Sequence, residues 1–79
     1  MPETTSLEKL SPGQSARVCH INTTGSMKRR LLDIGLVSGT VVECIGISPM
    51  GDPAAYLIRG AVIAIRSEDS KDIYVNILN

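Results

Sequence analysis

The chain has 79 residues, 8 basic and 8 acidic side chains, no Phe, no Trp and two Tyr, while 43% of its residues are apolar. This length fits one small domain, and the apolar content with zero net charge excludes a disordered chain. A neutral domain lacks the field that general phosphate-backbone binding needs, and the scarcity of aromatic rings removes the stacking platforms of single-strand binders. We therefore expect a folded domain that does not bind nucleic acid.

The termini and cysteines indicate a cellular compartment. No basic region followed by an apolar run opens the chain, so we expect no signal peptide, and no apolar stretch approaches the roughly 20 residues of a membrane span. The two cysteines, Cys19 and Cys44, do not make a disulfide-rich scaffold. We expect a cytoplasmic protein with reduced thiols, without direct membrane insertion. Residues 1–6 are expected to form a tail and residues 7–79 a single domain.

The first predicted elements are two strands that begin after similar turns. Pro12 and Gly13 suit a turn before a strand over 15–21, and Gly39 precedes a second strand over 40–47. Aligning the two turns places four residues on one inward face of the sheet: Ala16, Val18, Val42 and Cys44.

A helix over about 24–34 is predicted between these strands. Met27, Leu31 and Ile34 recur at helical spacing and form one apolar stripe. Thr23 or Thr24 is suited to cap the first turn, and Gly35 to end the helix in a left-handed conformation.

The second half of the chain reads as a loop and three short strands. Two prolines and one glycine fall within residues 48–53, which predicts a loop. Strands over 55–59 and 61–66 meet in a tight hairpin at Gly60, a polar turn covers 67–72, and 73–77 alternates as a final strand. Five short strands and one helix predict a mainly β fold, a small barrel with an inserted helix.

An ordered series of motifs resembles the ferrous iron transport protein A (FeoA) family. The series is Leu-Ser-Pro-Gly at 10–13, Arg-Leu-Leu-Asp-Ile-Gly-Leu at 30–36, Gly39 before a strand, Gly-Asp-Pro at 51–53, Ile-Ala-Ile-Arg-Ser-Glu-Asp at 63–69 and Ile-Tyr-Val at 73–75. The resemblance extends from about Leu7 to Ile77.

The resemblance implies an SH3-like β-barrel and a role in ferrous iron transport. Family members are cytoplasmic and are thought to work with a large membrane transporter of ferrous iron that carries a cytoplasmic GTP-binding domain. The expected function is that of an accessory or regulatory protein that contacts this partner and is recruited by it to the inner face of the membrane.

The residues themselves give no support for catalysis. His20 is the only histidine, and its neighbour Cys19 points to the opposite face in a regular strand. A thiol–imidazole pair is therefore poorly aimed, and we expect no enzyme. No Cys-x-x-Cys or His-x-x-x-His spacing is present, so we expect no cofactor and no tight iron site. Weak divalent-metal binding stays open, while Cys44 reads better as a small buried hydrophobe.

Two exposed features are candidates for partner binding. The basic run at 28–30 fits an acidic partner or phosphate, although short charge runs are more often solvated helix faces. The loop at 48–53 offers Met50 to a partner, unless Met50 folds back and Asp52 only satisfies turn amides. The predicted contact residues are Arg29, Met50, Gly51, Asp52 and Tyr56.

Two other functions compete with the transport role. One is a metal-linked regulatory domain related to the C-terminal SH3-like domain of iron-dependent repressors, which could not bind DNA alone because the chain has no helix-turn-helix. The other is a generic protein-interaction barrel. Two tyrosines cannot line the aromatic groove with which SH3 domains read polyproline, so an SH3-like shape does not imply Pro-rich ligands.

Overall fold

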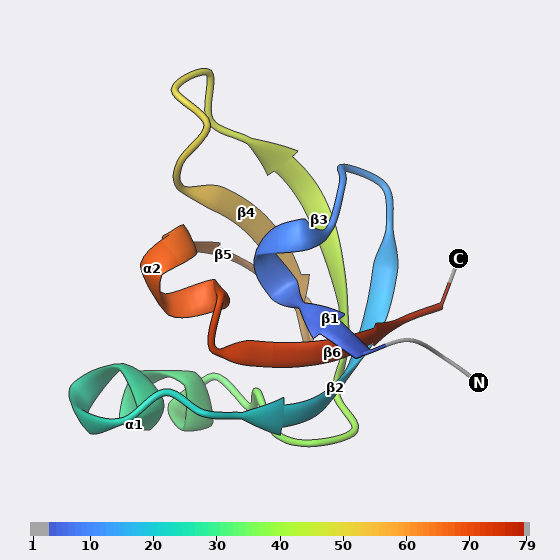
Figure 1. Cartoon of the computed structure of the whole chain (residues 1–79). Coiled ribbons are helices and arrows are strands. Elements are labelled where there is room, and N and C mark those ends of the chain that lie inside the picture. The colour runs from blue at the N-terminus through green and yellow to red at the C-terminus, as the bar shows by residue number, and fades with distance from the viewer. Residues whose placement is uncertain (1–3, 79) are drawn as a thin grey trace.

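Six strands form one antiparallel sheet that curves around a single core in the computed structural model, which describes residues 4–78 (Figure 1). The strand order is β1-β6-β2-β3-β4-β5. The strands are β1 (Thr4–Ser6), β2 (Ser15–Ile21), β3 (Val41–Ile47), β4 (Ala54–Ile58), β5 (Ala61–Ile65) and β6 (Ile73–Ile77). The helical segments are η1 (Leu7–Lys9), α1 (Gly25–Asp33) and α2 (Ser67–Ser70). The predicted mainly β fold with an inserted helix is confirmed.

The N-terminal segment differs from the prediction. Residues 1–3 of the expected tail lie outside the described residues, but Thr4–Ser6 form β1 and pair with β6 over the register Thr4↔Asn76 to Ser6↔Tyr74. The expected tail is therefore wrong for these three residues. They were missed because Thr-Thr-Ser has no apolar alternation, so its strand conformation comes from pairing with a strand that lies about 70 residues later.

The core is aliphatic apart from one tyrosine and one cysteine. All four residues assigned to the inward face are at most 1% exposed, which confirms that assignment. The buried apolar set is Leu7, Leu10, Ala16, Val18, Leu31, Leu36, Val42, Cys44, Tyr56, Ile58, Ile65, Ile73 and Val75. A chain without Phe or Trp thus fills its interior with small branched side chains that it draws from every strand except β1.

Helix α1 is anchored through one face and ends as predicted. Leu31 is 1% exposed, and Met27 and Ile34 pack against the core from half-buried positions. Gly35 has φ +88°, and the amide of Leu36 donates to the carbonyl of Leu31 at 2.9 Å, which closes the last turn.

The start of α1 differs from the prediction. Thr24 occupies the N-cap position but makes no side-chain capping bond, and the Oγ1 atom of Thr23 is buried without a partner among the described residues. The predicted threonine cap is therefore wrong. Gly25 begins the helix with φ +70°, a left-handed entry that departs from the extended-to-helical path of a capping residue.

Two β-bulges shape the sheet. One lies in β2 between Val18 and His20, and the other in β3 between Cys44 and Gly46. An extra residue in one strand increases the local twist and breaks the alternation of side chains. Ile45 and Ile47 are each 46% exposed as β3 approaches the following loop. No helix within residues 4–78 is long and apolar enough to cross a membrane.

Candidate functional site

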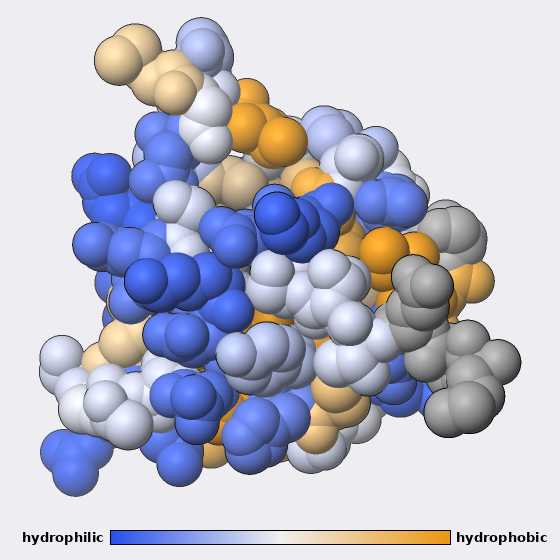
Figure 2. All heavy atoms as spheres, viewed as in Figure 1, coloured by the Kyte–Doolittle hydropathy of each residue, from blue (hydrophilic) through white to orange (hydrophobic). Residues whose placement is uncertain are grey.

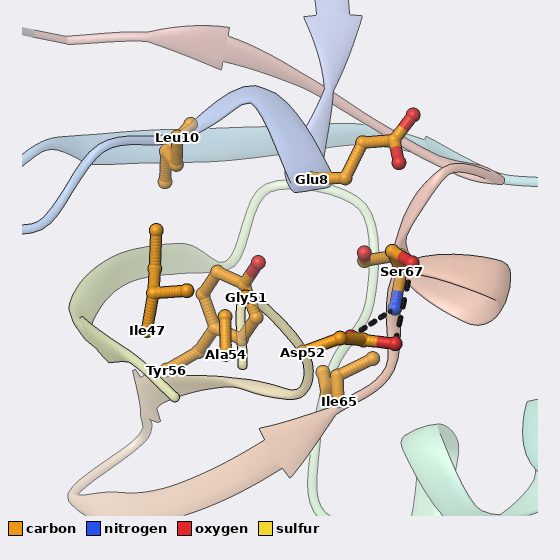
Figure 3. Close-up of a pocket in the computed structure, with 10 residues that line it drawn as sticks. Glu8, Leu10, Ile47, Gly51, Asp52, Ala54, Tyr56, Ile65 and Ser67 are labelled. Atoms are coloured by element: carbon orange, nitrogen blue, oxygen red, sulfur yellow. Dashed lines mark hydrogen bonds between the residues drawn. The ribbon is translucent and has the colours of Figure 1, made fainter. Parts of the chain in front are cut away.

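A small hollow of about 40 Å³ opens where η1, the β3–β4 loop and the start of α2 meet (Figure 3). Its walls come from segments far apart in the sequence: Glu8, Leu10, Ile47, Gly51, Asp52, Ala54, Tyr56, Ile65, Ser67 and Ser70. The floor is apolar, and the described residues at its rim include two carboxylates but no basic side chain. In Figure 2 the surface around α2 is mainly hydrophilic, while hydrophobic atoms reach the surface near the base of the loop.

The β3–β4 loop contributes Gly51 and Asp52 to the lining of the hollow, and it projects beyond the barrel (Figure 1). The amide of Gly51 donates to the carbonyl of Ser48 at 2.7 Å, and the amide of Ser48 donates to the carbonyl of Pro53 at 3.0 Å. Gly51 has φ +88°, which favours glycine at that position. Met50 lies at the tip and is 90% exposed. The loop is thus an ordered turn that presents one large flexible apolar side chain to solvent.

Asp52 ties this loop to α2. Its Oδ1 atom accepts from the backbone amide of Ser67 at 2.9 Å, and its Oδ2 atom accepts from the Ser67 hydroxyl at 3.4 Å (Figure 3). The peptide bond that follows it, Asp52–Pro53, is cis. Asp52 therefore satisfies an amide at the start of a distant helix rather than the amides of its own turn, and Met50 does not fold back onto the barrel.

Tyr56 lines the hollow from a buried position. Its side chain is 1% exposed, and its hydroxyl donates to the carbonyl of Leu7 at 3.4 Å. Burial raises the pKa of Tyr56 to about 12, while a hydrogen bond with Ser70 acts in the opposite direction. Tyr56 thus has almost no exposed surface of its own, and its predicted contact with a partner is restricted to a partner side chain that enters the hollow.

Arg29 is not brought near the other predicted contact residues. It is exposed on α1, which projects from a different part of the barrel than the β3–β4 loop (Figure 1). Lys28 and Arg30 beside it are also exposed. The molecule thus has two separate candidate surfaces. One is the hollow with its two carboxylates, together with the exposed loop tip at Met50. The other is the basic face of α1.

The residues with metal-binding or nucleophilic chemistry are dispersed. The Cys19 thiol donates to the carbonyl of Tyr74 at 3.3 Å, and the His20 ring stacks on the Tyr74 ring with centroids 6.2 Å apart. Cys44 is fully buried, and burial raises the pKa of its thiol. Within residues 4–78 no three His, Cys, Asp or Glu side chains are grouped to hold a metal ion.

Several residues of the hollow were not predicted from the sequence. Glu8 and Leu10 reach it because β1 pairs with β6 and carries η1 across the end of the barrel, and Ile47 reaches it from the end of β3. Ser67 reaches it through its bond to Asp52. No local pattern marks these positions. The only sequence signal was the Gly-Asp-Pro tripeptide at 51–53, which fixes one of the partners.

Known proteins are similar to this chain in sequence and in fold. A family model described as the FeoA domain matches residues 5–77. A curated relative from Porphyromonas gingivalis, named Fe(2+) transport protein A/Fe(2+) transporter FeoB fusion protein, is 27% identical over 73 residues, which make up 92% of this chain. The chain spans only 9% of the length of that fusion protein.

Solved structures share the fold. An NMR structure of a FeoA-like protein from Clostridium acetobutylicum is 32% identical with a TM-score of 0.88, over 100% of this chain and 92% of that one. A zinc complex of FeoA from Stenotrophomonas maltophilia, described as a procaryotic SH3 domain protein, is 25% identical with a TM-score of 0.76, over 91% of this chain and 89% of that one. A manganese-dependent transcriptional repressor is 19% identical with a TM-score of 0.85, over 99% of this chain and 44% of that one, a likeness in fold alone.

Proposed function

This chain belongs to the FeoA family of non-catalytic accessory domains associated with ferrous iron transport, and we propose that it regulates a membrane ferrous iron transporter by binding the transporter's cytoplasmic GTP-binding part. The observation that carries the proposal is the fusion relative, in which an Fe(2+) transport protein A and an Fe(2+) transporter share one polypeptide. The fusion keeps the two domains close to each other in one polypeptide. A separate chain with the FeoA fold is therefore expected to reach the same position by binding the transporter.

We propose that the β3–β4 loop makes the first contact. Met50 is 90% exposed at the tip of a loop whose base is held by Asp52 and Ser67, so its side chain can enter a partner pocket without unfolding the domain. An anchored loop with an exposed thioether loses little backbone freedom on binding. Beside it, the hollow offers an apolar floor to one side chain of the partner.

The basic face of α1 is proposed as a second contact. Arg29 and its two basic neighbours are exposed on α1, away from the loop. Surface charges of this kind steer association and add little affinity. The face therefore fits an acidic region of the same partner. The repressor-related alternative draws on a likeness in fold alone and gains no support from the site.

Uptake of ferrous iron in cells tests the proposed role. Removing the gene for this chain is expected to change the initial rate of uptake, and to change nothing in cells that also lack the transporter. Met50→Ser is expected to reproduce the deletion. Leu78→Ser is the matched control, because Leu78 is 50% exposed and lies outside the loop and the hollow. Unchanged uptake in the deletion strain would refute the proposal.

A further inference from the structure

The outer strand β5 leaves one edge of the sheet open. In the described sheet β5 is the last strand and pairs only with β4, from Ala54↔Ile65 to Ile58↔Ala61. Its sequence is Ala-Val-Ile-Ala-Ile, without a charge, a proline or a glycine. Val62 is 62% exposed in the middle of this strand. The edge is therefore regular, apolar and accessible from the outer face.

The hairpin at Arg59–Gly60 determines which backbone groups point outward. Arg59 and Gly60 both have positive φ, as in the two-residue turns that close antiparallel hairpins, so Ile58 and Ala61 form the first hydrogen-bonded pair. Pairs alternate from there, and the N–H and C=O groups of Val62 and Ala64 face away from β4. Within residues 4–78, no backbone hydrogen bond joins β5 to a segment other than β4.

The opposite edge of the sheet is protected where β5 is not. Strand β1 is three residues long and carries only hydroxyl side chains, Thr-Thr-Ser. Natural proteins blunt sheet edges with short strands, charges or prolines, because an exposed flat apolar edge is a template for another strand. The five residues of β5 include no charge and no proline, and the strand is longer than β1. The binding of a partner strand is the simplest explanation for an edge that is left unprotected in this way.

The charges at the two ends of β5 specify what such a strand carries. Arg59 precedes the strand and Arg66 follows it, both are exposed, and neither forms an ion pair within residues 4–78. In a twofold antiparallel pair of two copies centred on Ile63, Arg59 of one copy would lie next to Arg66 of the other. Like charges across a strand pair are destabilising, which argues against a second copy.

We propose that the free edge of β5 binds an extended segment of a partner protein as an added strand, and that this segment has about five uncharged residues flanked by carboxylates. Backbone bonds to Val62 and Ala64 hold the segment. The carboxylates meet Arg59 and Arg66. This inference stands apart from the proposed transport role, because it concerns the chemistry of the bound segment and uses a surface other than the β3–β4 loop.

A designed peptide tests the inference directly. The probe is Glu-Glu-Val-Thr-Val-Thr-Val-Glu-Glu, titrated into the ¹⁵N-labelled chain, with the same peptide flanked by lysines as its control. The acidic peptide is expected to shift the amide resonances of Val62 and Ala64 and to slow their hydrogen exchange. The lysine peptide is expected to bind about tenfold more weakly, since it places like charges against both arginines.

Variants of the chain separate the charges from the edge. Arg59→Asn keeps a residue that tolerates positive φ, and it or Arg66→Ser is expected to weaken binding about two- to fivefold. Arg17→Ser, which removes an exposed charge from β2, is the matched control and is expected to leave binding unchanged. Two further peptides carry N-methyl groups on alternate backbone nitrogens, one on the odd and one on the even positions. Only one set of nitrogens faces β5, so one of these two peptides is expected not to bind.

Three results would overturn the inference. They are no shift of the Val62 and Ala64 amides at millimolar acidic peptide, equal binding of both peptides, or shifts of these amides with chain concentration alone. The last would make a second copy the occupant, and sedimentation equilibrium would show the dimer. Each result can be obtained whether or not the chain alters iron uptake.

Discussion

The β3–β4 loop and helix α1 are both exposed projections of the barrel, but they are held in different ways. The loop is held by polar bonds, chiefly that between Asp52 and the amide of Ser67, and its tip residue Met50 is 90% exposed. Helix α1 is held by apolar burial, with Leu31 in the core. Its first turn lacks a side-chain cap.

This difference separates folding from binding on the two projections. On α1 the residue that anchors and the residue that would bind a partner lie on opposite faces, so Arg29 can be changed without touching the core. On the loop, anchor and contact are two residues apart, at Asp52 and Met50. Substitutions on α1 should therefore give either a stability defect or a binding defect, while substitutions of the loop anchor should give both.

The largest expected effect is on the anchor of α1. Leu31→Ala removes a side chain that is 1% exposed and should lower the free energy of unfolding by about 3 kcal/mol. Leu32→Ala is the matched control, because Leu32 is 49% exposed, and should change it by less than about 0.5 kcal/mol. Urea unfolding followed by circular dichroism measures both. Equal losses in the two variants would show that α1 is not held by its buried face.

The loop anchor should have a smaller effect. Asp52→Ala leaves the Ser67 amide without its partner and should cost about 1 kcal/mol of stability. Asp52→Asn keeps an oxygen that can accept the bond and should cost less. Hydrogen exchange of the Ser67 amide provides the local readout and should quicken in Asp52→Ala. An unchanged exchange rate there would mean that the loop is not tied to α2 by this bond.

Tyr56 should make the stability of the hollow depend on pH. Its pKa is raised to about 12, so the folded state holds the phenol proton more tightly than the unfolded chain. The stability that the neutral, buried phenol contributes to the folded state is therefore fully present below about pH 10 and is lost as the pH rises toward 12. Tyr56→Phe loses the bond to Leu7 and should be about 1 kcal/mol less stable at pH 7.

The difference in the free energy of unfolding between the wild type and Tyr56→Phe should narrow above pH 10, because only the wild type has this phenol proton to lose. Unfolding in urea at a series of pH values measures it, and the ultraviolet titration of Tyr56→Phe should lack one late-ionising tyrosine. A stability difference that stays constant from pH 7 to pH 11 would contradict a buried, neutral phenol.

Local patterns predicted the elements that carry their own signals. The alternation of residues 73–77 predicted β6, and Gly35 predicted the end of α1. The family resemblance predicted the SH3-like fold and the transport context, which neither composition nor periodicity contains. Arrangements that depend on distant pairing were not predicted: β1 and η1 take their places from β6, and the hollow exists only where they cross the end of the barrel.

Tyr56 shows the same limit at a single residue. Its position in a predicted strand left open which face it occupies, and an amphipathic ring with a hydroxyl suits a surface as well as a core. Only the closure of η1 and α2 over it decides the outcome, since Leu7 supplies the acceptor for its hydroxyl. The exposed tip at Met50, by contrast, follows from the loop residues around it.

Direct docking of the loop is tested most sharply by titrating the ¹⁵N-labelled chain with the transporter's cytoplasmic GTP-binding domain. We expect the amide resonances of Met50, Gly51 and Asp52 to shift, with smaller shifts around Arg29. Met50→Ser should weaken binding by about tenfold, the loss of one buried apolar anchor, and Leu78→Ser should not change it. Resonances that stay unmoved at saturating domain would contradict the account.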